Sequence, residues 1–373
     1  MKTRKLVLII FLLSFFFLAN IQNPDKPLKG EWDFKLKKIW EIDRAGDDVF
    51  GRPFSLMATE DGILYVYDTA NKINYIFDKD GNFIRAFAKS GQGPGEIIGQ
   101  EFTHYVNGKV YIPAMNGINL FTKDGVYIQT VKQEGRPLDP RIFLSNDEII
   151  SAPKTAVFLP EGKGKIIRKN IKTGDEAVIS EFSVQDWGMA HSRGRVIDMI
   201  SIGFSPLMTL GYSEGRLYWG MSSSYKINVT DLSGKKISSF SLKRKSKKVS
   251  NRFKKKYFKS PNFPDEMLAQ IADSFPDRLT FFHRIEVHKG LVYVFVPDVD
   301  LESKSAKIKQ IDIFSPDGKF LYCAYIKFEK NRHHLFSPLN NLVIKNKHLY
   351  AVLMDEDDNV LIAKYKLSLP NGN

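Results

Sequence analysis

The sequence predicts an all-β fold: a six-bladed β-propeller closed by an N-terminal strand, with a short helical insert between blades 4 and 5. Three observations predict it. Short alternating or apolar runs bounded by Gly, Asp, Asn and Pro fill most of the 373 residues, whereas apolar residues at helical spacing are scarce. One strand-and-turn unit recurs in six copies along the chain. A separate alternating run near the N-terminus can supply the strand that the last copy lacks.

The recurring unit is a glycine or polar turn, an apolar-aromatic strand, a polar gap, a second strand, an "xDG" turn and a third strand. Its six copies span residues 61–87, 107–131, 146–182, 214–242, 289–326 and 346–369. Each copy is a small antiparallel sheet that cannot bury its own faces, so stacking the copies around a ring covers them.

Ring closure is predicted from the N-terminal side. The sixth copy ends after its third strand, and an unpaired sheet edge there would invite association with other chains. The run "WDFKLKKIWEI", residues 32–42, alternates suitably to complete this last sheet. We therefore expect one propeller over residues 31–370.

The first residues predict export. "MKTRK" is a positively charged start, and Leu6 to Ala19 forms an apolar run that is short for a membrane span but typical of a signal-peptide core. Ala19 suits the position before a cleavage site, although Phe17 is bulky at the third position before it. We expect residues 1–22 to be a signal peptide or an uncleaved N-terminal anchor. Either way the body lies in the periplasm, at the cell surface or outside the cell.

The positive charge of the chain is concentrated in one segment. The run Lys243–Lys259 holds ten of the basic residues and no acid, which leaves about +3 of the formal +13 for the rest. Its members are Lys243, Arg244, Lys245, Lys247, Lys248, Arg252, Lys254, Lys255, Lys256 and Lys259. Charge this local, in an exported chain, argues against nucleic acid as a partner. It indicates either a solvated loop leading into a helix or a patch that meets an anionic membrane surface or polyanion.

We expect the insert over residues 243–288, and its remaining sequence predicts a short helix. "EMLAQIADSF" has apolar residues at helical spacing, Asp265 is a candidate N-cap, and Pro276 stops the helix.

One stretch resembles a known family. The run "ILYVYDTANKINYIFDKDGNFIRAFAKSGQGPGEI" resembles the first full blade of the exported six-bladed β-propeller proteins common in Bacteroidota and related bacteria, which are similar to NHL-repeat propellers. The matching positions are Asp68, Ile76, Phe77, Asp78, Gly81, Gly91, Gly93, Pro94, Gly95 and Glu96. The resemblance implies the fold and extracytoplasmic placement, and it brings no known reaction.

The glycine loop "GQGPGE" within that stretch could be mistaken for a phosphate-binding loop. It has neither the G-x-G-x-x-G spacing before a helix nor a Gly-Lys-Ser/Thr ending, and Pro94 opposes a helix after it. We interpret it as a blade-to-blade turn that uses the freedom of glycine in φ.

Several arginines predict an anion site. "FGRPFSLM" and "EGRPLDPRIF" place Arg52 and Arg136 just before the inner strands of two blades, and Arg141, Arg284 and Arg332 precede inner strands less cleanly. Loops at these places share one face with the mouth of the central channel, and a guanidinium binds carboxylate or phosphate in a bidentate manner. The alternative is that these arginines pair with acids such as Glu96 and Asp139 to fix loops.

No local catalytic motif was found. His283 and His288 would lie on opposite faces of a strand, and the acidic run Asp355–Asp358 lacks the spacing of a calcium loop. We therefore expect a binding or scaffold propeller that recognises an anionic small molecule, a glycan, a peptide or a protein partner at the channel mouth, without a cofactor. The alternative is a metal-dependent enzyme of lactonase or amidating-lyase type, holding Ca or Zn on the axis with residues from several blades.

Overall fold

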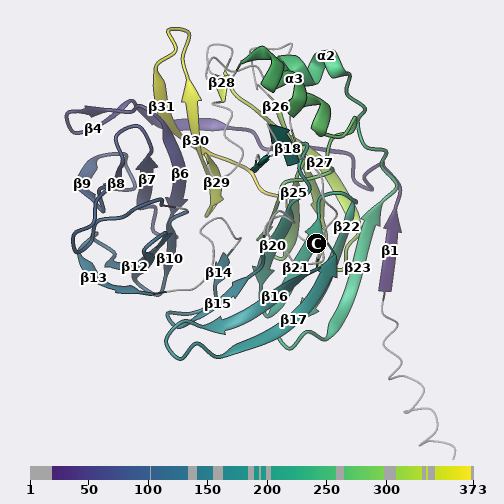
Figure 1. Cartoon of the computed structure of the whole chain (residues 1–373), viewed down its shortest axis with the longest axis horizontal. Coiled ribbons are helices and arrows are strands. Elements are labelled where there is room, and N and C mark those ends of the chain that lie inside the picture. The colour runs from purple at the N-terminus through teal and green to yellow at the C-terminus, as the bar shows by residue number, and fades with distance from the viewer. Residues whose placement is uncertain are drawn as a thin grey trace, which may run out of the picture.

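The computed structural model describes residues 19–100, 102–132, 141–153, 163–183, 189–192, 195–198, 203–257, 264–297, 308–329, 333–334 and 341–370. Six sheets follow one another around a ring, each forming one blade (Figure 1). The predicted six-bladed propeller is therefore confirmed.

Blades 1 to 3 each have four antiparallel strands, taken here from the inner strand outward. Blade 1 is β6 (Pro53–Ala58), β7 (Leu64–Asp68), β8 (Ile73–Phe77) and β9 (Phe83–Phe87). Blade 2 is β10 (His104–Val106), β11 (Lys109–Ala114), β12 (Gly117–Thr122) and β13 (Tyr127–Val131). Blade 3 is β14 (Arg141–Phe143), β15 (Glu148–Ser151), β16 (Lys163–Asn170) and β17 (Glu176–Ser183).

Blades 4 to 6 also contain strands from the N-terminus. Blade 4 is β20 (Met208–Ser213), β21 (Arg216–Met221), β22 (Lys226–Asp231), β23 (Lys236–Leu242) and β1 (Ala19–Asn23). Blade 5 is β24 (Arg284–His288), β25 (Leu291–Phe295), β26 (Ile308–Phe314), β27 (Phe320–Lys327) and β2 (Glu31–Asp33). Blade 6 is β28 (His333–His334) with β29 (Leu342–Lys345), then β30 (His348–Met354), β31 (Val360–Lys366) and β3 (Lys37–Ile42).

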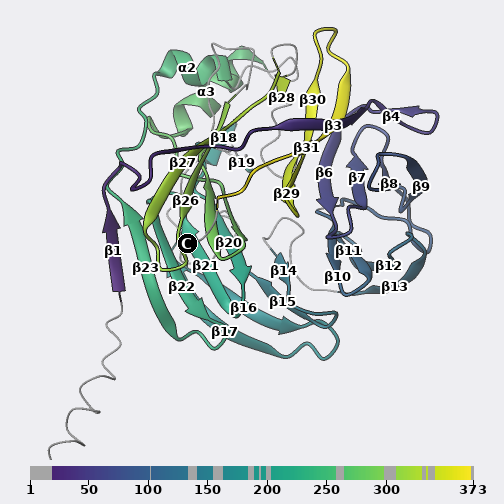
Figure 2. The same ribbon diagram turned by 180° about the vertical axis from the view of Figure 1, so that it is seen from behind.

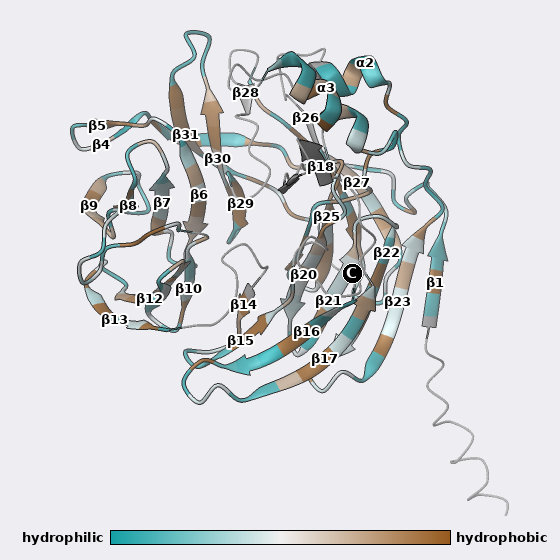
Figure 3. Ribbon diagram, viewed as in Figure 1, coloured by the Kyte–Doolittle hydropathy of each residue, from teal (hydrophilic) through white to brown (hydrophobic). Residues whose placement is uncertain are grey.

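Apolar side chains fill the seams between neighbouring blades. Strand alternation sends successive side chains to opposite faces, so Val110 and Ile112 of β11 pack toward blade 1 while Tyr111 packs toward blade 3. Among the described residues, each of the six seams has its own buried cluster of this kind. Figure 3 shows the apolar residues on the blade strands and mainly polar residues on the helices. Burial between blades, and not within one sheet, therefore stabilises the ring.

The "xDG" hinge of the repeat is the turn between the third and fourth strands, counted from the inner strand outward, of each of blades 1 to 5. In each turn one side chain accepts backbone N–H groups, and a glycine with positive φ follows three or four residues later. The accepting residues are Asp78, Thr122, Asn170, Asp231 and Ser315. Blade 6 lacks this turn because the corresponding strands, β31 and β3, come from opposite ends of the chain.

Two of these turn glycines provide a matched pair. Gly318 and Gly174 have similar φ values of +91° and +81°, so alanine is strained at both. A Cβ at Gly318 would lie 2.7 Å from Phe240 of the preceding blade, whereas nothing lies within 4 Å of a Cβ at Gly174. We expect Gly318→Ala to lower the free energy of unfolding by about 1–3 kcal/mol more than Gly174→Ala, because only the first overpacks a seam. Urea unfolding of both variants measures the difference, and equal losses would contradict the seam contact.

The predicted closure is confirmed, and the N-terminal segment does more than close the ring. β3 pairs antiparallel with β31 and completes blade 6, as expected for residues 32–42. Upstream, β1 pairs parallel with β23, and β2 pairs parallel with β27. Residues 19–42, called the strap below, therefore run along the outer edges of blades 4, 5 and 6 (Figure 2). Among the described residues the first strand, β1, begins at Ala19, which lies inside the predicted 1–22 leader or anchor and upstream of the expected boundary at residue 31.

Two hairpins and two helices of the described residues lie outside the six blades. The hairpin β4 (Arg44–Ala45) and β5 (Asp48–Val49) follows the strap, and the hairpin β18 (Met189–Ser192) and β19 (Arg195–Asp198) precedes blade 4. Helices α2 (Asn251–Tyr257) and α3 (Asp265–Ser274) form the insert, and α3 packs against β18. Among the described residues, no helix is long and apolar enough to cross a membrane.

The predicted helix is confirmed, with two corrections. Pro264, not Asp265, is its N-cap, and no side chain caps it. Asp265 lies in the first turn, where a carboxylate interacts favourably with the helix dipole. The insert also ends before residue 288, because Arg284–His288 is the inner strand of blade 5.

Candidate functional site

Of the five arginines predicted to line the channel mouth, the structure describes the side chains of Arg52 and Arg284. Arg52 precedes β6, where its backbone N–H and that of Gly51 donate to the buried carboxylate of Asp68 at 2.9 and 2.8 Å. The Arg52 side chain itself is exposed. Arg141 begins β14, with no side-chain position described. Arg136, Arg332 and the proposed pairing acid Asp139 lie outside the described residues.

Arg284 is held inside the seam between blades 5 and 6. Its Nη1 donates to the carbonyl of Leu342 at 2.7 Å, its Nη2 pairs with Glu286, and its guanidinium carbon lies 4.5 Å from the Phe295 ring centre. Burial raises the pKa of Glu286, but the charge of Arg284 and the hydrogen bond from His288 outweigh it and lower this pKa to about 2. For Arg284, pairing with an acid to fix the structure is therefore the correct interpretation.

The glycine loop is a turn, as predicted. The Glu96 carboxylate accepts the Gly93 N–H at 2.9 Å and pairs with Lys89 at 3.3 Å, and the Glu96 N–H donates to the Gly93 carbonyl. A Cβ at Gly91 would collide with the same carboxylate. The Glu96 carboxylate thus lies inside the loop, at the place where a bound phosphate would have to lie.

The basic run separates into internal and exposed residues. Lys254, only 2% exposed, donates to the Phe275 carbonyl at 2.7 Å and pairs with Asp277 at 3.0 Å, so it joins α2 to the end of α3. Its predicted place in an anionic-surface patch is therefore wrong. Arg244 is also engaged internally, as described below. The exposed members are Lys243, Lys245, Lys247, Lys248, Arg252 and Lys255. Lys256 lies in α2 with no side-chain position described, and Lys259 lies outside the described residues.

A cavity of about 790 Å³ lies between the strap, the insert and blade 5, and we call it the strap cavity. The strap contributes Asp25, Lys26, Pro27, Gly30 and Glu31. The insert contributes Arg244, Lys245, Ser246, Lys247, Leu279, Thr280 and Phe281. Blade 5 contributes Val296, Pro297, Gln310, Phe320, Cys323 and Tyr325. Its volume is typical of pockets that hold small-molecule ligands.

Arg244 is the most firmly positioned cation of the strap cavity. Its Nη1 and Nη2 donate to the two carboxylate oxygens of Asp312 at 2.5 and 3.4 Å, and its Nε donates to Asp25 at 2.6 Å. The guanidinium also lies against the rings of Tyr225 and Phe320, 5.3 and 6.0 Å from their centres. Because a guanidinium has five N–H donors, these contacts leave two of them for a ligand.

Behind Arg244 lies a polar network with a fully buried carboxylate at its centre. Asp312 has no exposed surface, and it also accepts hydrogen bonds from the Tyr225 hydroxyl at 2.6 Å and from Gln310 at 3.1 Å. Burial lowers the pKa of Arg244, but the charge of Asp312 and its hydrogen bond outweigh this effect and raise the pKa above its usual value. Arg244 therefore stays charged at every physiological pH.

The rim of the strap cavity is basic. Lys26, Lys245 and Lys247 are exposed, and within the described part of the chain none of the three forms an ion pair. Together with Arg244 they outnumber the two lining carboxylates, Asp25 and Glu31. Phe281, Phe320, Pro297 and Val296 supply apolar wall at the same time, so the cavity suits an anion that carries an apolar portion.

Two lining groups of this cavity, the Cys323 thiol and the Tyr325 hydroxyl, have raised pKa values. Burial raises the pKa of the Cys323 thiol, so at neutral pH it is not the reactive thiolate. A hydrogen bond with Cys323 and, to a smaller extent, burial raise the pKa of Tyr325 to about 12. Its hydroxyl therefore stays protonated at neutral pH and does not act as a base.

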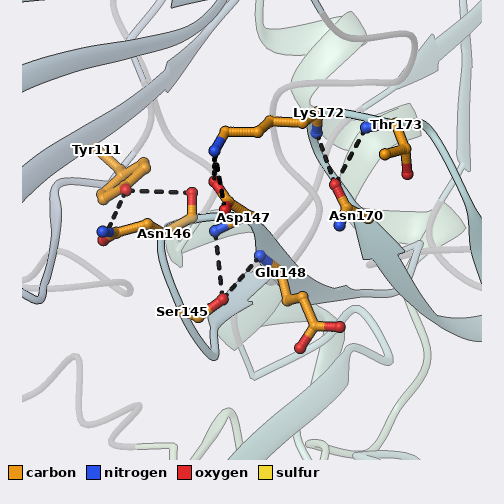
Figure 4. A network of polar contacts seen from close by, with 8 residues as sticks. All are labelled: Tyr111, Ser145, Asn146, Asp147, Glu148, Asn170, Lys172 and Thr173. Atoms are coloured by element: carbon orange, nitrogen blue, oxygen red, sulfur yellow. Dashed lines mark hydrogen bonds and ion pairs between the residues drawn. The ribbon is translucent and has the colours of Figure 1, made fainter.

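The seam between blades 2 and 3 carries a second polar cluster, whose partners are internal (Figure 4). Tyr111 donates to Asn146, Lys172 pairs with Asp147 at 2.9 Å, and Asn170 accepts the Lys172 N–H at 2.9 Å. Ser145 accepts two further backbone N–H groups of its own turn. These contacts join two turns to the neighbouring blade and account for the cluster as structure.

The sequence did not mark the residues that shape the strap cavity. Asp312 lies in an ordinary strand pattern, and Asn23 and Asp25 lie beside a predicted leader. Arg244 was singled out, but as part of an exposed patch. The sequence signal that could have distinguished Arg244 is its position two residues after the last strand of a repeat copy, where the chain leaves the blade.

Comparison with known proteins agrees with the fold. A family model (DUF5128) described as "6-bladed beta-propeller" matches residues 47–101, which include the stretch that carries the resemblance. No curated protein matches the sequence. A DUF4221 family member from Bacteroides vulgatus is 14% identical, with a TM-score of 0.57, over 90% of this chain and 99% of its own. A protein from Bacteroides fragilis described as exported is 13% identical, with a TM-score of 0.53, over 94% of this chain and all of its own. At these identities the likeness shows the fold alone.

Proposed function

We propose that this six-bladed β-propeller is an exported binding protein that takes a small anionic molecule with an apolar portion into the strap cavity. The export part rests on the charged start and apolar run of residues 1–19. The observation that carries the binding part is Arg244, fixed by two carboxylates and two rings at the wall of a cavity of about 790 Å³.

Preorganisation is the physical reason for this choice. A cation that is already immobilised loses little side-chain entropy when a ligand binds, so more of its interaction energy contributes to affinity. Lys26, Lys245 and Lys247 add charge from the rim without needing to break existing ion pairs in the described part of the chain. Phe281 and Pro297 offer apolar surface for the rest of the ligand.

The test uses one pair of probes and one pair of variants. The anion 1-naphthoate and the neutral 1-naphthamide have the same apolar body and differ in charge. We expect naphthoate to raise the melting temperature and naphthamide to have little effect. Lys245→Gln with Lys247→Gln should weaken naphthoate binding about tenfold, or about 1.4 kcal/mol. Lys243→Gln with Lys248→Gln is the matched control, because both residues are exposed members of the same run and neither lines the cavity.

Two outcomes would contradict the proposal: equal binding of both probes, or equal weakening by both double variants. A titration with Ca²⁺, Zn²⁺ and Mn²⁺ in the same assay tests the enzyme alternative. A rise in melting temperature that EDTA reverses would favour a metal-dependent propeller.

A further inference from the structure

We infer that a second anion site, for an acidic oligosaccharide, lies around the turns between the two inner strands of blades 5 and 6. A hollow of about 580 Å³ there, called the lysine hollow below, is lined by five lysines and no carboxylate. Its lining residues are Trp32, Lys35, Lys37, Lys289, Lys347, Lys366, Leu367, Ser368, Leu369 and Pro370. All five lysines are exposed, and within the described part of the chain none forms an ion pair.

Two of these lysines lie directly opposite each other on neighbouring strands of one sheet. Lys37 of β3 is paired directly with Lys366 of β31. Like charges directly opposite each other on neighbouring strands are destabilising. A bound anion would relieve this repulsion, which gives the pair a role that the fold itself does not require.

Lys347 occupies a backbone position that favours glycine. It is the second residue of the two-residue turn Asn346–Lys347 and has φ +61°. The corresponding turns of blades 2, 4 and 5 place Gly108, Gly215 and Gly290 there, with φ values of +81°, +77° and +75°. An L-residue in this region is strained by its Cβ. Lys347 therefore lies at the edge of the hollow although glycine would fit this backbone conformation with less strain.

The hollow has the size and an aromatic surface for a sugar acid. At about 580 Å³ it lies in the range of pockets for small-molecule ligands, well above the volume of a single inorganic ion. Trp32 is half-buried, its indole N–H donates to the Ser368 carbonyl at 2.9 Å, and its ring packs edge-on against Tyr322. A fixed aromatic ring can stack on the apolar face of a sugar while the lysines bind its carboxylates. We therefore infer a short chain of acidic sugars as the ligand.

This inference is independent of the strap cavity, since the two sites share no lining residue. Failure of one site leaves the other intact. The Lys245→Gln, Lys247→Gln variant should bind the oligosaccharide as the natural chain does.

The test variant is built from turns that this chain already contains. Lys289→Glu copies the Glu214–Gly215 turn of blade 4, and Lys347→Gly copies the Asn107–Gly108 turn of blade 2. The double variant should therefore fold, with a melting temperature equal to or above that of the natural chain. Calorimetric titration with tetragalacturonate should show at least a tenfold loss of affinity, and the affinity of the natural chain should fall with added salt.

Three controls define the result. Lys235→Glu with Lys236→Gln makes the same net charge change at exposed positions of blade 4 and should retain binding. Maltotetraose, a neutral chain of the same length, should not bind. Equal losses in the two charge variants, or equal binding of maltotetraose, would overturn the inference. Sulfate that competes fully at a similar concentration would show a site for small ions and also overturn it.

Discussion

Replacing Asp312 with alanine is expected to lower the free energy of unfolding by about 3–5 kcal/mol, because it leaves a buried charge without its partner. Asp312 has no exposed surface, and the Arg244 side chain is only 17% exposed. The variant would leave Arg244 with one remaining carboxylate, Asp25, and the buried Tyr225 hydroxyl without an acceptor among the contacts described. Chemical denaturation followed by circular dichroism measures the change.

Asp80→Ala is the matched control for this prediction. Asp80 also pairs with a cation, Lys79, at 2.6 Å, but both side chains are more than 60% exposed. Exposed pairs contribute about 0–1 kcal/mol, so this variant should remain close to the natural chain. A loss below about 1 kcal/mol for Asp312→Ala would mean that the network is not buried as described. Adding Arg244→Leu to Asp312→Ala should recover part of the loss, since it removes the charge that has lost its buried partner.

Asn23→Ala is expected to lower the free energy of unfolding by about 2–4 kcal/mol. The Asn23 side chain is 5% exposed and joins the strap to two blades. Its Nδ2 donates to the carbonyls of Gly318 and Ser241 at 2.9 and 3.2 Å, and its Oδ1 accepts the Phe320 N–H at 2.9 Å. Alanine would leave three backbone groups unsatisfied, two of them buried with Asn23, and each such group costs about 1–3 kcal/mol when water cannot replace the partner.

Gln22→Ala provides the comparison on the same strand. Gln22 is exposed, so its replacement should change the free energy of unfolding by no more than about 0.5 kcal/mol. Both variants keep the β1 backbone pairing, so the difference between them isolates the Asn23 side chain. A chain that starts at residue 26 lacks β1 entirely and should lose at least as much stability as Asn23→Ala. Equal stability of that shortened chain and the full chain would show that the strap does not stabilise blades 4 and 5.

Both effects concern the same region of the molecule. Asn23 attaches the strap to blades 4 and 5, and Asp25, two residues later, binds Arg244 at the wall of the strap cavity. A variant that loosens the strap should therefore also weaken naphthoate binding, whereas Asp80→Ala should not.

The blade count, the closure of blade 6, the helix of the insert and the role of the "GQGPGE" loop could be predicted from the sequence. These features depend on local chemistry. Asp78 and Gly81 form a turn within five residues, strand alternation repeats every two residues, and Glu96 lies three residues from Gly93, whose N–H it accepts.

The positions of the cavities and the charges that remain available on their walls could not be predicted without the folded chain. The parallel pairing of Ala19 with Ser238 joins positions more than 200 residues apart, and such pairs leave no periodic signal in the sequence. The same holds for Arg244 with Asp312 and for the lysines gathered from the strap and blades 5 and 6. Whether a charged side chain is a structural partner or an open binding group depends on its distance to the nearest opposite charge, and for these residues only the folded ring sets that distance.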